Sequence, residues 1–145
     1  MSSPPDVLLL VEDHPDDVAL TLRALRIAKA SYPVVVKHDG VEALEFLFGR
    51  GAQALPRLVV LDLNLPRLDG VGVLQAIRAD PRTCQVPVLI LTSSMLDDDL
   101  SACYRFGANS YLVKPIDFSQ FVSMVTLISS YWMTLNQTAP AQVPA

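Results

Sequence analysis

Hydrophobic residues gather in five short runs along the chain, and a longer stretch with helical spacing follows each run. Several runs are apolar at successive positions rather than at every second one, which is typical of strands covered on both faces. Strands that alternate with helices predict parallel βαβ units, and therefore a doubly wound five-stranded parallel sheet of the α/β class. The runs are Val7–Val11, Val34–Val36, Leu58–Leu63, Val86–Leu91 and Ser110–Val113. The helical stretches are roughly Asp16–Lys29, Val41–Phe48, Gly70–Ala79, Leu96–Phe106 and Phe118–Leu135.

Turn and cap residues support these boundaries. An Asp-Gly pair at 39–40 precedes the second helical stretch, and another at 69–70 precedes the third. Asp117 can cap the last helix, with Gln120 three residues on as the return partner of a capping box. The connection Gly49–Arg57 is longer than such loops usually are.

Length and composition are those of one folded domain. The chain has 145 residues, of which 51% are hydrophobic and 18% charged, so it can bury an ordinary core. We expect this domain to cover residues 6–135, between flexible tails at 1–5 and 136–145 that are rich in Ser, Pro, Ala and Gln. The net charge of −4, without a Lys/Arg cluster, argues against a nucleic-acid partner.

Targeting and cysteine patterns indicate a cytoplasmic protein. The apolar run at Val7–Val11 is short and follows no basic segment, so we expect neither a signal peptide nor a membrane partner. Cys84 and Cys103 match no zinc-binding spacing and are interpreted as reduced thiols, with a disulfide as the alternative. No glycine-rich nucleotide-binding loop is present.

Polar residues collect where the predicted strands end. Glu12 and Asp13 follow the first strand, Asp62 ends the third, Thr92 ends the fourth, and Lys114 follows the fifth. In an open α/β sheet these ends line one edge, and ligands bind there at the topological switch point. The common strand order 2-1-3-4-5 makes strands one and three neighbours at that point. Glu12, Asp13 and Asp62 should therefore converge in one crevice, with Thr92 and Lys114 beside them.

This set of residues suits metal-assisted phosphoryl transfer. Three carboxylates in one pocket resist joint ionisation unless a cation joins them, and loosely arranged oxygen ligands favour Mg²⁺. A carboxylate can then act as nucleophile and form an aspartyl phosphate, with charge stabilisation from Lys114 and the Thr92 hydroxyl. Each residue alone has an ordinary explanation as a solvated strand end, a turn cap or a surface charge. Their combination at four strand ends favours a functional site.

The chain resembles the receiver domains of bacterial response regulators over about residues 6–130. The stretches that carry the resemblance are LLLVEDHPDD, LVVLDLNLPRLDG, VPVLILTSS and GANSYLVKPID. The resemblance implies a flavodoxin-like fold and a single-domain response regulator of a two-component system. Such a protein accepts phosphate from a sensor histidine kinase and signals by a change in its binding surface. It also implies a phosphoacceptor that promotes its own Mg²⁺-dependent phosphotransfer and dephosphorylation, rather than an enzyme.

Matching positions imply roles for particular residues. Asp62 resembles the phosphoacceptor, and Glu12 and Asp13 resemble the acidic pair that binds metal, although many members have Asp where Glu12 stands. Asn64 resembles the residue whose backbone carbonyl completes the metal site. The remaining matches are Thr92 as the switch hydroxyl, Tyr111 as the switch aromatic, Lys114 as the phosphate-binding lysine and Pro115 as a proline after a cis peptide bond.

The last helix is the most individual feature of the sequence. Its length should carry Tyr131 and Trp132 past the sheet, at the edge opposite Asp62. These aromatics either pack on the Gly49–Arg57 connection or anchor a homodimer, and we favour the dimer. The long connection and the YWMTLN ending resemble small response regulators paired with bacterial phytochrome kinases, which are commonly dimeric. The apolar stripe of this helix is expected at Phe121, Val125, Ile128, Trp132 and Leu135.

Two other classes of function remain open. A Mg²⁺-dependent hydrolase with an aspartyl-phosphate intermediate would place a DxD motif after the first strand, where this chain has Glu12-Asp13-His14-Pro15. A phosphate-independent binding module of the degenerate receiver type usually lacks one of the acidic pair, the acceptor or the lysine, and this chain has them all.

Overall fold

A five-stranded parallel sheet forms the centre of the protein. The computed structural model describes residues 6–49 and 55–140, and the strand order is β2-β1-β3-β4-β5, as the sequence predicts. Within the register, Val11 at the end of β1 lies beside Leu61 at the end of β3, so the residues that follow both strands emerge together. The strands are β1 (Leu8–Val11), β2 (Val34–Lys37), β3 (Leu58–Leu61), β4 (Val88–Thr92) and β5 (Ser110–Val113).

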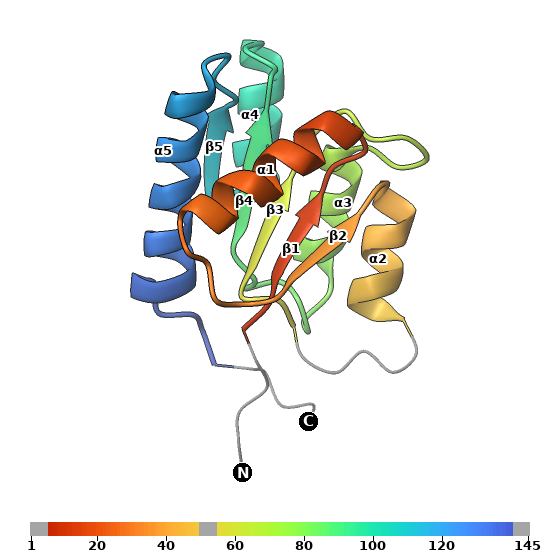
Figure 1. Cartoon of the computed structure of the whole chain (residues 1–145). Helices are drawn as coiled ribbons and strands as arrows, with labels where there is room; N and C mark the ends of the chain where they lie inside the picture. Colours follow the sequence, from red (N-terminus) through yellow and green to blue (C-terminus); the bar gives the residue numbers. More distant parts are fainter. Residues whose placement is uncertain (1–5, 50–54, 141–145) are drawn as a thin grey trace.

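Helices cover both faces of this sheet (Figure 1). On one face, α1 and α5 pack on strand residues such as Leu10 and Val60; on the other, α2, α3 and α4 pack on the alternate positions, such as Leu9 and Val59. This alternation explains why the central strands are apolar at every position. The helices are α1 (Pro15–Ile27), α2 (Gly40–Phe48), α3 (Gly70–Ala79), α4 (Asp97–Arg105) and α5 (Phe118–Ser130), followed by the π-helix η1 (Tyr131–Leu135).

The aspartates that the sequence places before three helices do cap them. The side chains of Asp39, Asp69 and Asp117 accept hydrogen bonds from backbone N–H groups in the first turns of α2, α3 and α5. Gly70, which begins α3, lies directly against the backbone carbonyl of Asp62, where a Cβ atom would collide. The start of α3 is therefore packed against the residue that ends β3.

The end of the last helix differs from the prediction. The expected regular helix changes at Tyr131 into a π-helical turn, in which the Asn136 N–H donates to the Tyr131 carbonyl at 2.6 Å. The wider turn shifts the inward face by one residue, so Met133 is buried while Leu135 is 68% exposed. Trp132 is half-buried against the α1–α5 side of the core. The predicted apolar stripe of the last helix is confirmed at Phe121, Val125 and Ile128, which are buried. It is wrong at Leu135, which is exposed.

Other predictions on the chain ends and loops are only partly covered by the structure. Residues 1–5, 50–54 and 141–145 lie outside the described part, which therefore leaves out the whole first tail, half of the second and much of the long connection. At the end of that connection, Arg57 donates to the backbone carbonyls of Trp132, Thr134 and Asn136. This ties η1 to the start of β3. Within the described residues, no helix is both long and apolar enough to cross a membrane.

Candidate functional site

Four strands bring the predicted site residues together at the carboxyl edge of the sheet. The Glu12 N–H donates to the Lys37 carbonyl at 3.0 Å, and the Asp62 N–H donates to the Val11 carbonyl at 3.1 Å, so the ladder itself positions both residues. One carboxylate oxygen from each of Glu12, Asp13 and Asp62 lies within 4.8 Å of the other two. Glu12 and Asp62 are buried, whereas Asp13 is exposed. The structure thus confirms the predicted convergence of the three carboxylates.

Lys114 reaches into this cluster from the end of β5. Its backbone N–H donates to the Thr92 carbonyl at 2.8 Å, which fixes the residue beside β4. Its Nζ lies 2.7 Å from Glu12 Oε2, 2.9 Å from Asp17 Oδ2 and 3.2 Å from Asp62 Oδ2. One ammonium group therefore bridges three carboxylates, and only 13% of the Lys114 side chain is exposed.

The two buried carboxylates are held on both of their oxygens. Asp62 Oδ1 accepts from the Leu63 N–H at 2.7 Å, and Glu12 Oε1 accepts from the His14 N–H at 3.1 Å. Lys114 uses the second oxygen of each. Both carboxylates therefore have fixed orientations before any ligand arrives.

Burial and neighbouring charges shift the pKa values of Glu12 and Lys114. Burial raises the pKa of the Glu12 carboxyl to about 7, and the nearby Asp62 carboxylate adds to the rise while Lys114 opposes it. For Lys114, burial opposes the charged form, but the Glu12 and Asp17 carboxylates outweigh it and raise the pKa of the ammonium group above its usual value. A further cation would relieve the remaining repulsion between the carboxylates.

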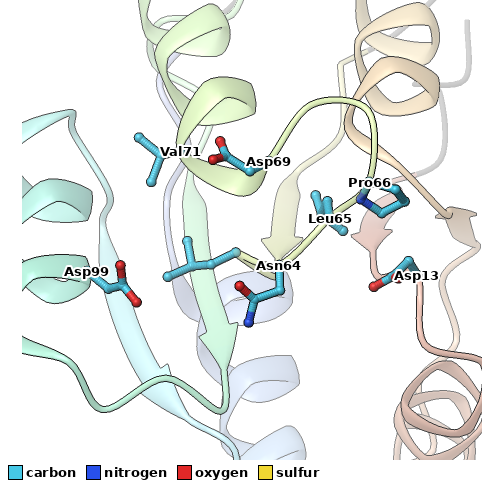
Figure 2. Close-up of a pocket in the computed structure, with 8 residues that line it drawn as sticks. Asp13, Asn64, Leu65, Pro66, Asp69, Val71 and Asp99 are labelled. Atoms are coloured by element: carbon cyan, nitrogen blue, oxygen red, sulfur yellow. The ribbon is translucent and has the colours of Figure 1, made fainter.

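The donor set fits a hard divalent cation. Glu12, Asp13 and Asp62 offer carboxylate oxygens, which Mg²⁺ prefers, and they form the one such group of three found among the described residues. Beside them lies a cavity of about 390 Å³ (Figure 2). Asp13 and Asn64 both line it, so the Asn64 position borders the acidic cluster as the sequence analysis expects. Metal binding by the Asn64 carbonyl stays a prediction.

A hydrogen-bonded chain leads from Thr92 towards α4 and β5. Thr92 is fully buried, and its hydroxyl accepts from the Ser94 N–H at 3.3 Å. The Ser94 hydroxyl donates to Asp99 Oδ2 at 2.5 Å, and the Tyr111 hydroxyl donates to the Ser94 carbonyl at 3.1 Å. Tyr111 is half-buried against the α2–α4 side of the core. The two predicted switch residues, Thr92 and Tyr111, thus meet at Ser94.

The expected cis peptide bond before Pro115 is not found. No cis bond occurs in the described residues, so the Lys114–Pro115 bond is trans. The trans form is the more stable one for most prolines. Lys114 reaches the acidic cluster nonetheless, because its position follows from the β4–β5 ladder and the length of its side chain.

Asp17, whose Oδ2 contacts Lys114, is a functional candidate that the sequence did not predict. It lies in the first turn of α1, where acidic residues are favoured by the helix dipole whatever else they do. The signal in the sequence is its position four residues after Asp13, in the first turn of the helix that follows the acidic pair. Nothing in that spacing alone identifies Lys114 as its partner.

Tyr131 and Trp132 lie at the opposite edge of the sheet, as expected. Their rings contact each other edge-to-face with centroids 5.0 Å apart. Tyr131 is 50% exposed and Trp132 is half-buried, and the Trp132 carbonyl accepts from Arg57 at the start of β3. The aromatics are thus remote from the acidic cluster.

Known proteins resemble the chain in sequence and in fold. The family model for the response regulator receiver domain matches residues 8–126. The response regulator Rcp1 of Synechocystis is 37% identical over 143 residues, which cover 97% of this chain and 97% of Rcp1. Two solved structures each cover 94% of this chain and 100% of their own. The Mn²⁺-bound form of Rcp1 has a TM-score of 0.86 at 34% identity. The phosphorylated cyanobacterial phytochrome response regulator RcpA has a TM-score of 0.87 at 33% identity.

Proposed function

The chain belongs to the response regulator receiver family, and from this we propose that it is a single-domain response regulator phosphorylated on Asp62 by a sensor histidine kinase. The observation that carries the proposal is the cluster itself. A buried aspartate at the end of β3 lies among the carboxylates of Glu12 and Asp13 and within 3.2 Å of the Lys114 ammonium. Nucleophile, cation ligands and a phosphate-binding charge are in one place.

The proposed transfer uses one oxygen of Asp62. The Leu63 N–H holds Oδ1, which leaves Oδ2, now paired with Lys114, to attack the phosphorus of a phosphohistidine. A bond forms between Oδ2 and phosphorus, the phosphorus–nitrogen bond breaks, and its electron pair leaves with the imidazole, which takes up a proton. Lys114 then balances charge on the phosphoryl oxygens. When bound by Glu12, Asp13, Asp62 and the Asn64 carbonyl, Mg²⁺ would supply further positive charge to these oxygens.

Signalling then follows from a change at Thr92. In the proposed switch, its hydroxyl moves from the Ser94 N–H to the phosphoryl group, and Tyr111 adjusts behind it. The Ser94 contacts with Tyr111 and Asp99 support this route, because they connect Thr92 to both β5 and α4. The output is a changed binding surface rather than catalytic turnover.

Two partners belong to this proposal. Similarity to the phytochrome response regulator RcpA supports a phytochrome-type kinase as the phosphodonor. The second partner is another copy of this chain, which would dock on the outer face of the last helix. Leu127, Tyr131 and Leu135 are all at least half exposed there, at intervals of four residues. The cytoplasmic location expected from the sequence stays a prediction.

Intact-mass measurement after incubation with Mg²⁺ and acetyl phosphate tests the proposed chemistry. We expect the wild-type protein to gain one phosphoryl group and Asp62→Asn to gain none. Asp98→Asn, which removes an exposed carboxylate from α4, is the control and should still form the adduct. Continuous turnover of acetyl phosphate without adduct would instead indicate a hydrolase. The absence of any reaction would indicate a phosphate-independent binding module.

A further inference from the structure

Asp17 is the one partner of Lys114 that lies outside the acidic cluster. Its Oδ2 is 2.9 Å from Lys114 Nζ, whereas the other two partners, Glu12 and Asp62, both belong to the group of three carboxylates. Asp17 comes from α1 and Lys114 from the end of β5, 97 residues apart. The contact therefore joins two elements across the site.

Glu12 and Asp62, the other two partners, cannot both keep their contacts with Lys114 throughout the proposed reaction. Glu12 Oε1 and Asp62 Oδ1 are already bonded to the N–H groups of His14 and Leu63. In the proposed transfer phosphorus bonds to Asp62 Oδ2, and a cation bound by Glu12 would draw on the charge of the carboxylate whose Oε2 contacts Lys114, so both ligands would compete with the lysine. Each step of the reaction would weaken the hold of these two residues on the lysine.

Asp17 is well placed to stay in position. Helix α1 begins at Pro15, which favours the first helical turn, and it buries Ala24 and Leu25 in the core. The Asp17 backbone carbonyl also accepts from the Thr21 hydroxyl at 2.8 Å. The helix N-terminus favours the ionised carboxylate. The side chain is 36% exposed, so its charge is less costly than that of the buried Glu12.

We propose that Asp17 is a positioning residue that anchors Lys114 at the edge of the site while Glu12 and Asp62 exchange the lysine for metal and phosphoryl ligands. This inference rests on the proposed phosphoacceptor function. Asp17 keeps the ammonium group within reach of the phosphoryl oxygens, and it also lowers the repulsion between that ammonium and an incoming cation. It touches neither the nucleophile nor the phosphate.

Nuclear magnetic resonance of the ¹⁵N-labelled Lys114 ammonium tests this directly, with the signal assigned by its loss in Lys114→Arg. In the wild type we expect the signal to persist when saturating Mg²⁺ is added. In Asp17→Asn it should be present without Mg²⁺, because Glu12 and Asp62 still hold the lysine, and it should broaden beyond detection with Mg²⁺. Asp17→Glu should keep the signal in both states.

The matched control is Asp16→Asn. Asp16 lies in the same first turn and carries the same charge, but it is exposed and makes no contact with Lys114. We expect Asp16→Asn to behave as wild type and Asp17→Asn to form the phosphoryl adduct about tenfold more slowly at saturating Mg²⁺, the scale of one charge-assisted hydrogen bond.

Two results would overturn the inference. One is an identical Lys114 signal and adduct rate in Asp17→Asn and Asp16→Asn. The other is a wild-type Lys114 signal that disappears as soon as Mg²⁺ binds. Failure of the proposed function would give a different result. The wild-type protein would then form no phosphoryl adduct, while the Lys114 signals of the variants would still show whether Asp17 holds the lysine.

Discussion

Both carboxylate oxygens of Asp62 already accept a hydrogen bond. Leu63 holds Oδ1 through its backbone N–H, and Lys114 holds Oδ2 at 3.2 Å. Gly70 packs on the Asp62 carbonyl and leaves no space for a side chain there. Asp62, the proposed nucleophile, is thus oriented by the backbone at one oxygen and by Lys114 at the other.

Replacing Lys114 by Gln should have opposite effects on two measurements. We expect the rate of adduct formation from acetyl phosphate to fall about 10²-fold, because a charge that stabilises the transferred phosphoryl group is lost. We expect divalent metal to bind more tightly, because a positive charge beside Glu12 and Asp62 is removed. A metal titration and intact-mass kinetics measure the two effects. Lys37→Gln is the control, and equal effects in both variants would contradict the role of Lys114.

At the residue scale, the sequence predicts which charged residues form the site, but it does not predict all of the contacts between them. Glu12, Asp13, Asp62 and Lys114 were found because each directly follows or ends a recognisable strand. Asp17 was missed because its contact depends on how α1 lies over the sheet and on how far Lys114 extends. Neither property can be read from spacing.

At the scale of elements, the centres of the strands and helices lie where the sequence predicts them, whereas some of their ends do not. The run Ser110–Val113 and the helix Gly70–Ala79 have the predicted bounds, because a turn or cap residue marks their ends. The run Leu58–Leu63 was predicted two residues too long, since Leu63 is as apolar as the strand but belongs to the loop that holds Asp62. The π-turn at Tyr131–Leu135 follows from packing of Met133 and from the bonds of Arg57, which no helical period encodes.

Arg57→Ala should loosen the end of the last helix. Arg57 is the donor to three backbone carbonyls near η1, and only 19% of its side chain is exposed. We expect a loss of about 1–3 kcal/mol in the free energy of unfolding, together with faster amide exchange at Asn136. Arg105→Ala, at an exposed position of α4, should change stability by less than about 0.5 kcal/mol. Unchanged exchange at Asn136 in Arg57→Ala would contradict this role.

The connection between β4 and α4 should respond to phosphorylation through Tyr111. Its hydroxyl now donates to the Ser94 carbonyl, and the ring is half-buried. Nuclear relaxation of the Tyr111 ring with and without beryllofluoride, a phosphoryl mimic, should show a change of side-chain rotamer or of its dynamics. Thr92→Ala should abolish that change, because the Thr92 hydroxyl is the proposed link to the phosphoryl group. One unchanged rotamer in the wild type would rule out this switch.

At the scale of the whole molecule, the site and the exposed end of the last helix lie at opposite edges of the sheet (Figure 1). If phosphorylation controls association, the signal has to cross the domain. The contacts of Thr92, Ser94 and Tyr111 begin such a route at β4 and β5, and α5 follows β5 directly in the chain.

Tyr131→Asp should weaken the proposed homodimer. Tyr131 is half exposed between Leu127 and Leu135 on the outer face of the last helix, and a carboxylate there would be buried at the interface at a large cost. Sedimentation equilibrium over a range of concentrations should show a dimer for the wild type and a monomer for the variant. Met95→Asp, at a residue 80% exposed at the opposite edge, should leave the dimer intact. A wild-type protein that is monomeric at every concentration would exclude the dimer.

Borohydride trapping tests the central claim, that Asp62 accepts the phosphoryl group, most directly. Borohydride reduces the acyl carbon of an aspartyl phosphate, phosphate leaves, and homoserine remains in the chain. After treatment with Mg²⁺ and acetyl phosphate, peptide mapping should find homoserine at position 62 and unmodified carboxylates at Glu12, Asp13 and Asp17. Reduction at any of these three residues, or a phosphorylated protein in which residue 62 remains aspartate, would contradict the account.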